Sequence, residues 1–231
     1  MQNIQLVIFD CDGVLVDSEY LAARIESKLL TDAGYPIDVA TMSERYSGMS
    51  WKSILLDVEK DSPVPLSASL FEQAEKLVDM ALERELDIIE GVSQTVQKIK
   101  YPKCICSNSS SERLGISLGR VGLHRVFAPY IFAAHEVGNK KGKPDPNVFQ
   151  FAAKRFNALP QKTVVIEDSV HGVSAAAAAG MRVIGFTGGA HSYDGHADKL
   201  IDAGAETAVA RFIEIPAVIE AFAVWAGPDA A

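Results

Sequence analysis

Short runs of apolar residues recur along the chain, and each has the length of a buried strand. The first occupies residues 6–9 and ends abruptly at Asp10. A continuous apolar run of this kind is typical of a strand that is covered on both faces of a parallel sheet. Comparable runs, each predicted to be a further strand, lie at 104–106, 130–132, 164–166 and 183–186.

Stretches with helical character separate these predicted strands. They span 111–120, 148–156 and 170–179. Gly122 follows the first, Pro146 precedes the second and Gly180 closes the third, as helix-flanking residues often do. Regular alternation of strand and helix favours βαβ units. The pattern therefore predicts an α/β fold with a doubly wound parallel sheet of the Rossmann-like type.

The segment between the first two predicted strands has a different pattern. Leu21, Ile25 and Leu29 repeat at helical spacing, and an apolar stripe on a longer helix covers 70–82. Ser50 is placed to cap a further helix that reaches residue 58. We therefore predict a helical cap over 17–89, inserted into a catalytic core made of 1–16 and 90–231. The alternative is an elaborated crossover helix, but about 70 residues is long for a simple connection.

Composition limits the classes of partner. The chain has 231 residues, of which 48% are hydrophobic, and this suits one α/β core with an insertion. A net charge of −8 disfavours nucleic acid as the main partner, because binding to a phosphate backbone usually needs a basic face. Three cysteines are too few for a disulfide framework, and no Cys/His cluster has the spacing of a zinc site.

The expected compartment is the cytoplasm. The N-terminus lacks the basic and long apolar regions of a signal peptide. No apolar run approaches the roughly 18 residues that a membrane span needs. We expect no membrane partner, and a monomer or weak homodimer.

Polar side chains follow the predicted strands where each strand ends. In an open α/β sheet, ligands bind outside the carboxyl ends of the strands, so these side chains should meet. Several carboxylates at one edge would repel one another unless a hard cation joined them, and an oxygen site suits Mg²⁺. Such a cation would also neutralise a phosphoryl group beside a carboxylate nucleophile. The residues expected to meet are Asp10, Asp12, Ser107, Asn108, Lys143, Glu167 and Asp168.

The four segments of sequence that contain these residues together resemble the motifs of a known family. Residues 10–18, Asp-Cys-Asp-Gly-Val-Leu-Val-Asp-Ser, look like motif I of the haloacid dehalogenase (HAD) superfamily. Residues 106–109, 143–146 and 166–169 resemble its motifs II, III and IV, in the family's order and spacing. The helical insertion after motif I resembles the C1 cap of the β-phosphoglucomutase and phosphoglycolate phosphatase branch. The resemblance covers almost the whole chain and implies a HAD-type phosphoric monoester hydrolase.

The resemblance implies a role for each catalytic residue. Asp10 would be the nucleophile that becomes an aspartyl phosphate. Asp12 would act as general acid and base, protonating the leaving alcohol and then activating water. Ser107 would bind the phosphoryl group, and Lys143 would stabilise the charge on the nucleophile and the phosphate.

The resemblance also implies a set of ligands for Mg²⁺. Asp168 would hold the ion together with the carboxylate of Asp10 and the main-chain carbonyl of Asp12. Glu167 would be a further ligand, either directly or through water. Many relatives have Gly or Asp at the position of Glu167.

Other residues are candidates for binding the phosphate or the rest of the substrate. Gly13 lets the main chain approach an anion closely, and Asn108 and Ser109 follow Ser107 with further donors. Gly48 resembles the turn of the cap that closes on the substrate. Lys52 is placed to meet a second anionic group such as a sugar-acid carboxylate, the alternative being a solvated helix lysine. Further cap residues expected to face the crevice are Glu19, Tyr46, Met49, Ser50 and Trp51.

Three histidines near the motifs have ordinary interpretations. His171 lies at a predicted helix start, where a surface or capping role is expected. His191 and His196 flank a Gly-containing loop and suggest either a metal site or solvated side chains. Loops of this composition commonly hold solvated histidine, which favours the second interpretation.

The expected function is hydrolysis of a small phosphorylated metabolite. Within the family, Asp12 indicates phosphoryl chemistry, because the true dehalogenases lack a second Asp there. Ala22 stands where the related mutases typically carry a His, which favours a Mg²⁺-dependent phosphatase acting on a sugar phosphate or sugar-acid phosphate. A β-phosphoglucomutase-like phosphotransferase is the first alternative. A phospho-accepting signalling or binding module is the second, although it would not need a cap.

Overall fold

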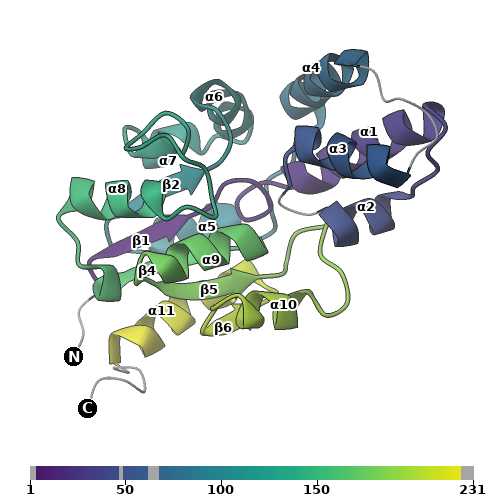
Figure 1. Cartoon of the computed structure of the whole chain (residues 1–231). Helices are drawn as coiled ribbons and strands as arrows, with labels where there is room; N and C mark the ends of the chain where they lie inside the picture. The colour runs from purple at the N-terminus through teal and green to yellow at the C-terminus, as the bar shows by residue number, and fades with distance from the viewer. Residues whose placement is uncertain (1–3, 47–48, 62–67, 225–231) are drawn as a thin grey trace.

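A computed structural model describes residues 4–46, 49–61 and 68–224. Its centre is a six-stranded parallel sheet with the strand order β3-β2-β1-β4-β5-β6 (Figure 1). The predicted doubly wound sheet is thus confirmed. β1 lies between β2 and β4, so the strand order reverses there, where such sheets bind ligands. The strands are β1 (Leu6–Phe9), β2 (Lys103–Ser107), β3 (Ile131–Ala133), β4 (Thr163–Glu167), β5 (Arg182–Phe186) and β6 (Thr207–Val209).

Alternate side chains of each strand enter two different cores, as the period of a strand requires. Leu6 and Ile8 belong to the core on one face of the sheet, with residues of three helices. Two short 3-10 helices, Pro160–Lys162 and Phe212–Glu214, lie in connections between the main elements. The helices on this first face are α8 (Asn147–Phe156), α9 (Val170–Ala178) and α10 (His196–Asp202).

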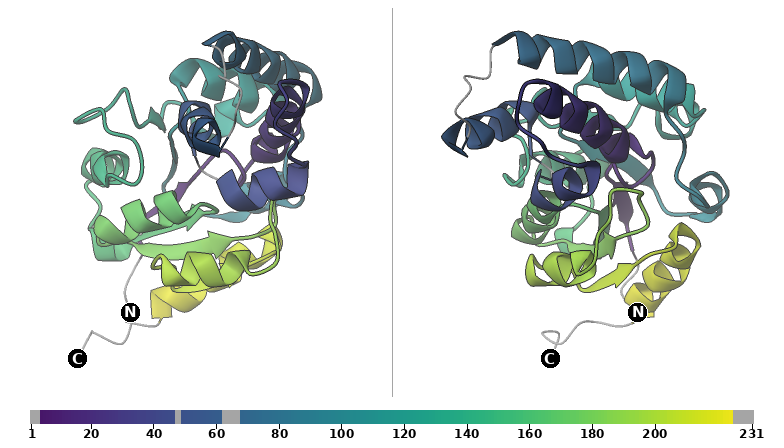
Figure 2. Two further views of the ribbon diagram at one scale, coloured as in Figure 1. Left: turned by 45° about the vertical axis from the view of Figure 1, so that its right-hand side comes forward. Right: turned by 90° about the vertical axis from the view of Figure 1, so that its right-hand side faces the viewer.

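The opposite face of the sheet carries the second core. Val7 and Phe9 pack there, and the ring of Phe9 lies 5.7 Å from that of Phe127, centroid to centroid. Figure 2 shows that helices cover both faces, so the core has three layers. The helices on this second face are α5 (Val92–Lys98), α6 (Ser111–Arg120), α7 (His124–Phe127) and α11 (Ile215–Val224).

Four helices follow β1 and form a group to one side of the sheet (Figure 1). They have a small core of their own that includes Leu30, Met42 and Val58. No strand lies among their described residues, which confirms the predicted α/β core with a helical cap. The cap helices are α1 (Ser18–Asp32), α2 (Val39–Tyr46), α3 (Trp51–Asp61) and α4 (Ala68–Glu85).

The two segments that connect the cap to the core run side by side. Val16 pairs with Ile88 in an antiparallel bridge. The main-chain N–H of Asp17 donates to the carbonyl of Asp87 at 3.2 Å. At this crossing the chain passes between the core and the cap. Among the described helices, none combines the length and the apolar character that crossing a membrane requires.

Candidate active site

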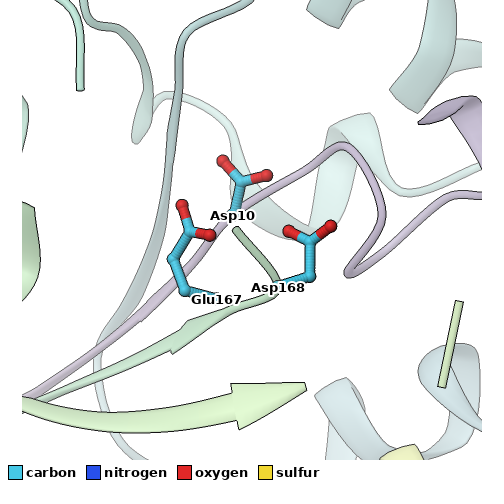
Figure 3. Close-up of side chains that lie close together, drawn as sticks. All are labelled: Asp10, Glu167 and Asp168. Atoms are coloured by element: carbon cyan, nitrogen blue, oxygen red, sulfur yellow. The ribbon is translucent and has the colours of Figure 1, made fainter. Parts of the chain in front are cut away.

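Three buried carboxylates meet at the carboxyl ends of the two central strands (Figure 3). Asp10 follows β1, Glu167 ends β4 and Asp168 comes next. β1 and β4 are paired in register, so their ends place these residues together although they are far apart in sequence. Oxygen atoms of the three carboxylates all lie within 4.8 Å of one another.

Lys143 places an ammonium group beside this cluster. Its Nζ donates to Oδ1 of Asp10 and to Oε1 of Glu167, at 2.5 Å in each case. The lysine lies between β3 and α8, and the side chain of Asn108 fixes its main chain. The Lys143 N–H donates to Oδ1 of Asn108 at 2.8 Å, and Nδ2 of Asn108 donates to the Lys143 carbonyl at 3.3 Å. The amide of Asn108 thus holds the loop that carries Lys143.

The electrostatics of this cluster favour a bound cation. Burial raises the pKa of the Asp10 and Asp168 carboxyl groups well above the ordinary value. Burial alone would lower the pKa of the Lys143 ammonium, but the neighbouring carboxylates of Asp10 and Glu167 raise it. Three ionised carboxylates and one ammonium leave two net negative charges, which a divalent cation would neutralise. Oxygen donors of this kind fit a hard cation such as Mg²⁺.

The fourth acidic residue, Asp12, directs its carboxylate to hydroxyl groups. Ser18 donates to Oδ1 at 2.7 Å, and Ser107 and Ser109 donate to Oδ2 at 3.0 and 2.8 Å. Asp12 lines the same cavity as Asp10 but its side chain is outside the three-carboxylate cluster. The site therefore has two parts. Three carboxylates form one cluster, and the Asp12 carboxylate lies apart from it, hydrogen-bonded to Ser107 and Ser109.

Gly13 lies against the carboxylate of Asp168. Its φ is +77°, and a Cβ at this position would stand 2.1 Å from Oδ2 of Asp168. A side chain here would displace that carboxylate, so glycine is required by a neighbouring acid as well as by the backbone conformation. Gly172 has the same relationship with Glu167, because a Cβ there would lie 1.8 Å from Oε1.

A cavity of about 540 Å³ lies between the cap and the cluster. Of the predicted cap residues, Lys52 is exposed and does not line it, and Gly48 lies outside the described residues. Lys52 differs from Trp51, its buried neighbour on α3, because successive helical residues point in different directions. The predicted cap residues that do line the cavity are Glu19, Tyr46, Met49, Ser50 and Trp51.

The cap wall of the cavity is acidic. Burial raises the pKa of Glu19 to about 8 and that of Glu26 to about 7. One arginine crosses from the core to this wall, where Arg113 pairs with Glu75 and Asp79 of α4. The sequence patterns did not single out Glu26 or Arg113, because their place in the cavity depends on how the cap packs against α6.

The structure corrects the expected environment of two histidines. Solvated side chains were expected for His191 and His196, but each is only 2% exposed. His191 lines the cavity, as do His135 and His171. Glycine at 189 leaves room for the ring of His191, because a Cβ there would lie 2.7 Å from its Nδ1. The ring is therefore buried, although the composition of the loop favoured a solvated side chain.

Comparison with known proteins points to one family. A family model described as haloacid dehalogenase-like hydrolase matches residues 4–180. The chain is 31% identical over 209 residues to a phosphorylated carbohydrates phosphatase of Thermotoga maritima, covering 87% of this chain and 92% of that protein. It is 29% identical over 193 residues to the 6-phosphogluconate phosphatase of Escherichia coli, covering 83% of this chain and 86% of the relative.

The fold is also similar to solved structures. One is a conserved haloacid dehalogenase-like protein of unknown function from Agrobacterium tumefaciens. It is 56% identical, with a TM-score of 0.92, and the match covers 96% of this chain and 100% of that one. The family match and the phosphatase names of the two relatives support the predicted class of enzyme, a phosphoric monoester hydrolase.

Proposed function

Because the chain belongs to the family of haloacid dehalogenase-like hydrolases, we propose that it is a Mg²⁺-dependent phosphatase that hydrolyses a sugar phosphate through an aspartyl phosphate on Asp10. The observation that carries this proposal is the meeting of Asp10, Glu167, Asp168 and Lys143 at one end of the sheet. The cavity beside them supplies room for a small substrate.

In the first step, a carboxylate oxygen of Asp10 forms a bond to phosphorus as the bond from phosphorus to the sugar oxygen breaks. Asp12 gives a proton to that leaving oxygen, so the sugar departs as an alcohol. Lys143 keeps the Asp10 carboxylate oriented through Oδ1 and offsets the charge that gathers on the phosphoryl oxygens. Ser107 and Ser109 hold Asp12 through their hydroxyls.

In the second step, Asp12 accepts a proton from a water molecule that attacks phosphorus from the opposite side. The bond between phosphorus and the Asp10 oxygen breaks, which releases phosphate and regenerates the carboxylate. Asp10, Glu167 and Asp168, with the main-chain carbonyl of Asp12, are the groups that would hold Mg²⁺. When bound, the ion would neutralise negative charge on the phosphoryl group and the carboxylates.

The charge of the cavity favours a neutral sugar over a sugar acid. Glu19, Glu26, Glu75 and Asp79 line the cap side, and Arg113 already pairs with two of these. Lys52, the lysine expected to meet a second anion, does not reach the cavity. Carboxyl groups with a raised pKa donate hydrogen bonds to sugar hydroxyls, whereas a substrate carboxylate would be repelled by those that ionise.

An assay of full-length enzyme tests the proposal. Glucose 6-phosphate, 6-phosphogluconate and a generic aryl phosphate are each incubated with and without Mg²⁺, and free phosphate and sugar products are measured. We expect Mg²⁺-dependent release of phosphate, faster from the neutral sugar than from the sugar acid. Loss of activity in Asp10→Asn is expected. An isomeric hexose phosphate without net release of phosphate would instead identify a mutase, and hydrolysis that survives Asp10→Asn would refute the nucleophile.

A further inference from the structure

Two histidine side chains lie against Asp168. Nε2 of His191 lies 2.8 Å from Oδ2 of Asp168, and Nε2 of His196 lies 2.7 Å from its main-chain carbonyl oxygen. His191 lies in the segment that connects β5 to α10, His196 is the first residue of α10, and both rings are almost completely buried. The motif resemblance assigned no role to either histidine.

The tautomer of His196 follows from its partners. A carbonyl oxygen only accepts, so Nε2 of His196 carries the proton that is donated to Asp168. Nδ1 of the neutral ring then accepts from the hydroxyl of Ser192 at 3.0 Å. Burial lowers the pKa of His196, which agrees with a neutral ring. This histidine therefore fixes the main chain of Asp168.

The ring of His191 occupies a position that the surrounding chain is shaped to accept. A Cβ at Gly13 would stand 2.8 Å from its Cε1, and one at Gly189 would stand 2.7 Å from its Nδ1. The loop is tied to the cap connection, because the N–H of Ala190 donates to Oδ1 of Asp17 at 2.8 Å. Neither ring nitrogen of His191 makes an aligned hydrogen bond, although both are buried.

A buried imidazole beside a carboxylate is stabilised when its N–H donates a hydrogen bond to a carboxylate oxygen. The terminal torsion of an aspartate is soft, so the Asp168 carboxylate is free to rotate toward Nε2 of His191, which lies 2.8 Å from Oδ2. We propose that His191 is a positioning residue for Asp168, which holds one carboxylate oxygen so that the other faces the cation. This inference rests on the proposed function, because it concerns the cation of that same site. Partners of this kind typically change metal affinity by about 10–100-fold.

Direct measurement of Mg²⁺ binding to the full chain tests this role without turnover. The variants for isothermal titration are His191→Leu, which removes the donor at similar volume, and His191→Gln, which restores a donor near the position of Nε2. His124→Leu, at an exposed histidine of α7, controls for the loss of an imidazole. We expect His191→Leu to weaken Mg²⁺ binding by about 10–100-fold, and the other two to stay within about 3-fold of the original chain.

Circular dichroism without metal establishes that each variant is folded. If His191→Leu does not fold, His191→Asn replaces it, because its shorter side chain cannot reach the position of Nε2 and is expected to weaken binding equally. Unchanged affinity in the donor-free variant, or equal loss in His191→Gln, would overturn the positioning role. An unsubstituted protein that neither binds Mg²⁺ nor hydrolyses phosphate esters would refute the proposed function instead.

Discussion

Arg113 on α6 donates from Nε to Oδ1 of Asp79 on α4 at 2.8 Å, and this ion pair joins the core to the cap. Its Nη2 also reaches Oε2 of Glu75 at 3.1 Å. All three side chains line the cavity, so this contact fixes α4 of the cap against α6 of the core at the edge of the cavity. Closure of such a cap would exclude bulk water from phosphoryl transfer.

Replacement of Arg113 should affect substrate binding more than folding. The ion pairs are partly exposed and each contributes about 0–1 kcal/mol to the free energy of unfolding. We expect Arg113→Met to raise KM several-fold with a loss of about 1 kcal/mol in urea unfolding. Arg24→Met, which removes an exposed pair with Glu85 outside the cavity, is the matched control and should leave KM unchanged. An unaltered KM in Arg113→Met would contradict this account of the cap.

If Asp12 protonates the leaving group, the loss of kcat on replacing Asp12 should depend on how readily that group leaves. A sugar alkoxide needs a proton as it leaves, whereas a nitrophenolate leaves readily without one. We therefore expect Asp12→Asn to reduce kcat by about 10²–10⁴-fold on a sugar phosphate and far less on the aryl ester. Steady-state rates on both esters provide the comparison, with Ser109→Ala as a control that removes one of the three hydroxyl donors. Equal losses on the two esters would argue against an acid role for Asp12.

Binding of Mg²⁺ should stabilise the fold, and more so at higher pH. The raised pKa values of Asp10 and Asp168 mean that protons compete with the cation as the pH falls. With Mg²⁺ at about 100 times its Kd, the expected gain is about 2.7 kcal/mol, or roughly 5–10 °C in Tm. Thermal melts at pH 5 and pH 8, with Mg²⁺ or with a chelator, measure the effect. Asp168→Asn should lose most of the rise in Tm that Mg²⁺ causes. If the Tm of the unsubstituted protein at pH 8 were the same with Mg²⁺ and with the chelator, the proposed cation site would be excluded.

Glu26 should make stability fall as the pH rises. Its pKa is about 7 in the folded chain against 4.5 in the unfolded chain, because burial penalises its charge. The unfolded chain therefore loses its proton first, and this group's contribution declines between about pH 4.5 and pH 7. We expect Glu26→Gln to be more stable than the unsubstituted protein at pH 8 by about 1 kcal/mol, and equal to it at pH 4.

Urea unfolding across this pH range measures the difference. Glu44→Gln, at an exposed position on α2, controls for the loss of one carboxylate. If Glu26→Gln and the unsubstituted protein had parallel stability profiles from pH 4 to pH 8, the penalty on the Glu26 charge would be refuted.

The strand ends of the core were predictable because their signals are local. The run that ends at Phe9 is buried on both faces, and Asp10 follows it directly. The predicted helices at 111–120 and 170–179 correspond closely to α6 and α9. By contrast β6 has three residues at the edge of the sheet, two of them only half-buried, and so carries little periodicity.

The parts of the site that sequence patterns missed depend on distant segments. His191 is buried because glycines at 13 and 189 admit its ring, and the loop composition contains no sign of that contact. Lys52 points away from the cavity because Trp51 takes the buried face of α3. Arg113 acquires its role only through the packing of α4 against α6, which no local pattern specifies.

The central claim is that Asp10 captures phosphorus covalently. Acid quenching of full-length enzyme within a turnover of a sugar phosphate, followed by borohydride reduction and peptide mapping by mass spectrometry, tests it most directly. An aspartyl phosphate is reduced to homoserine, whereas a free carboxylate is unchanged. We predict homoserine at position 10, only when substrate and Mg²⁺ are both present. Release of phosphate with residue 10 unmodified, or reduction at a different aspartate, would contradict the account.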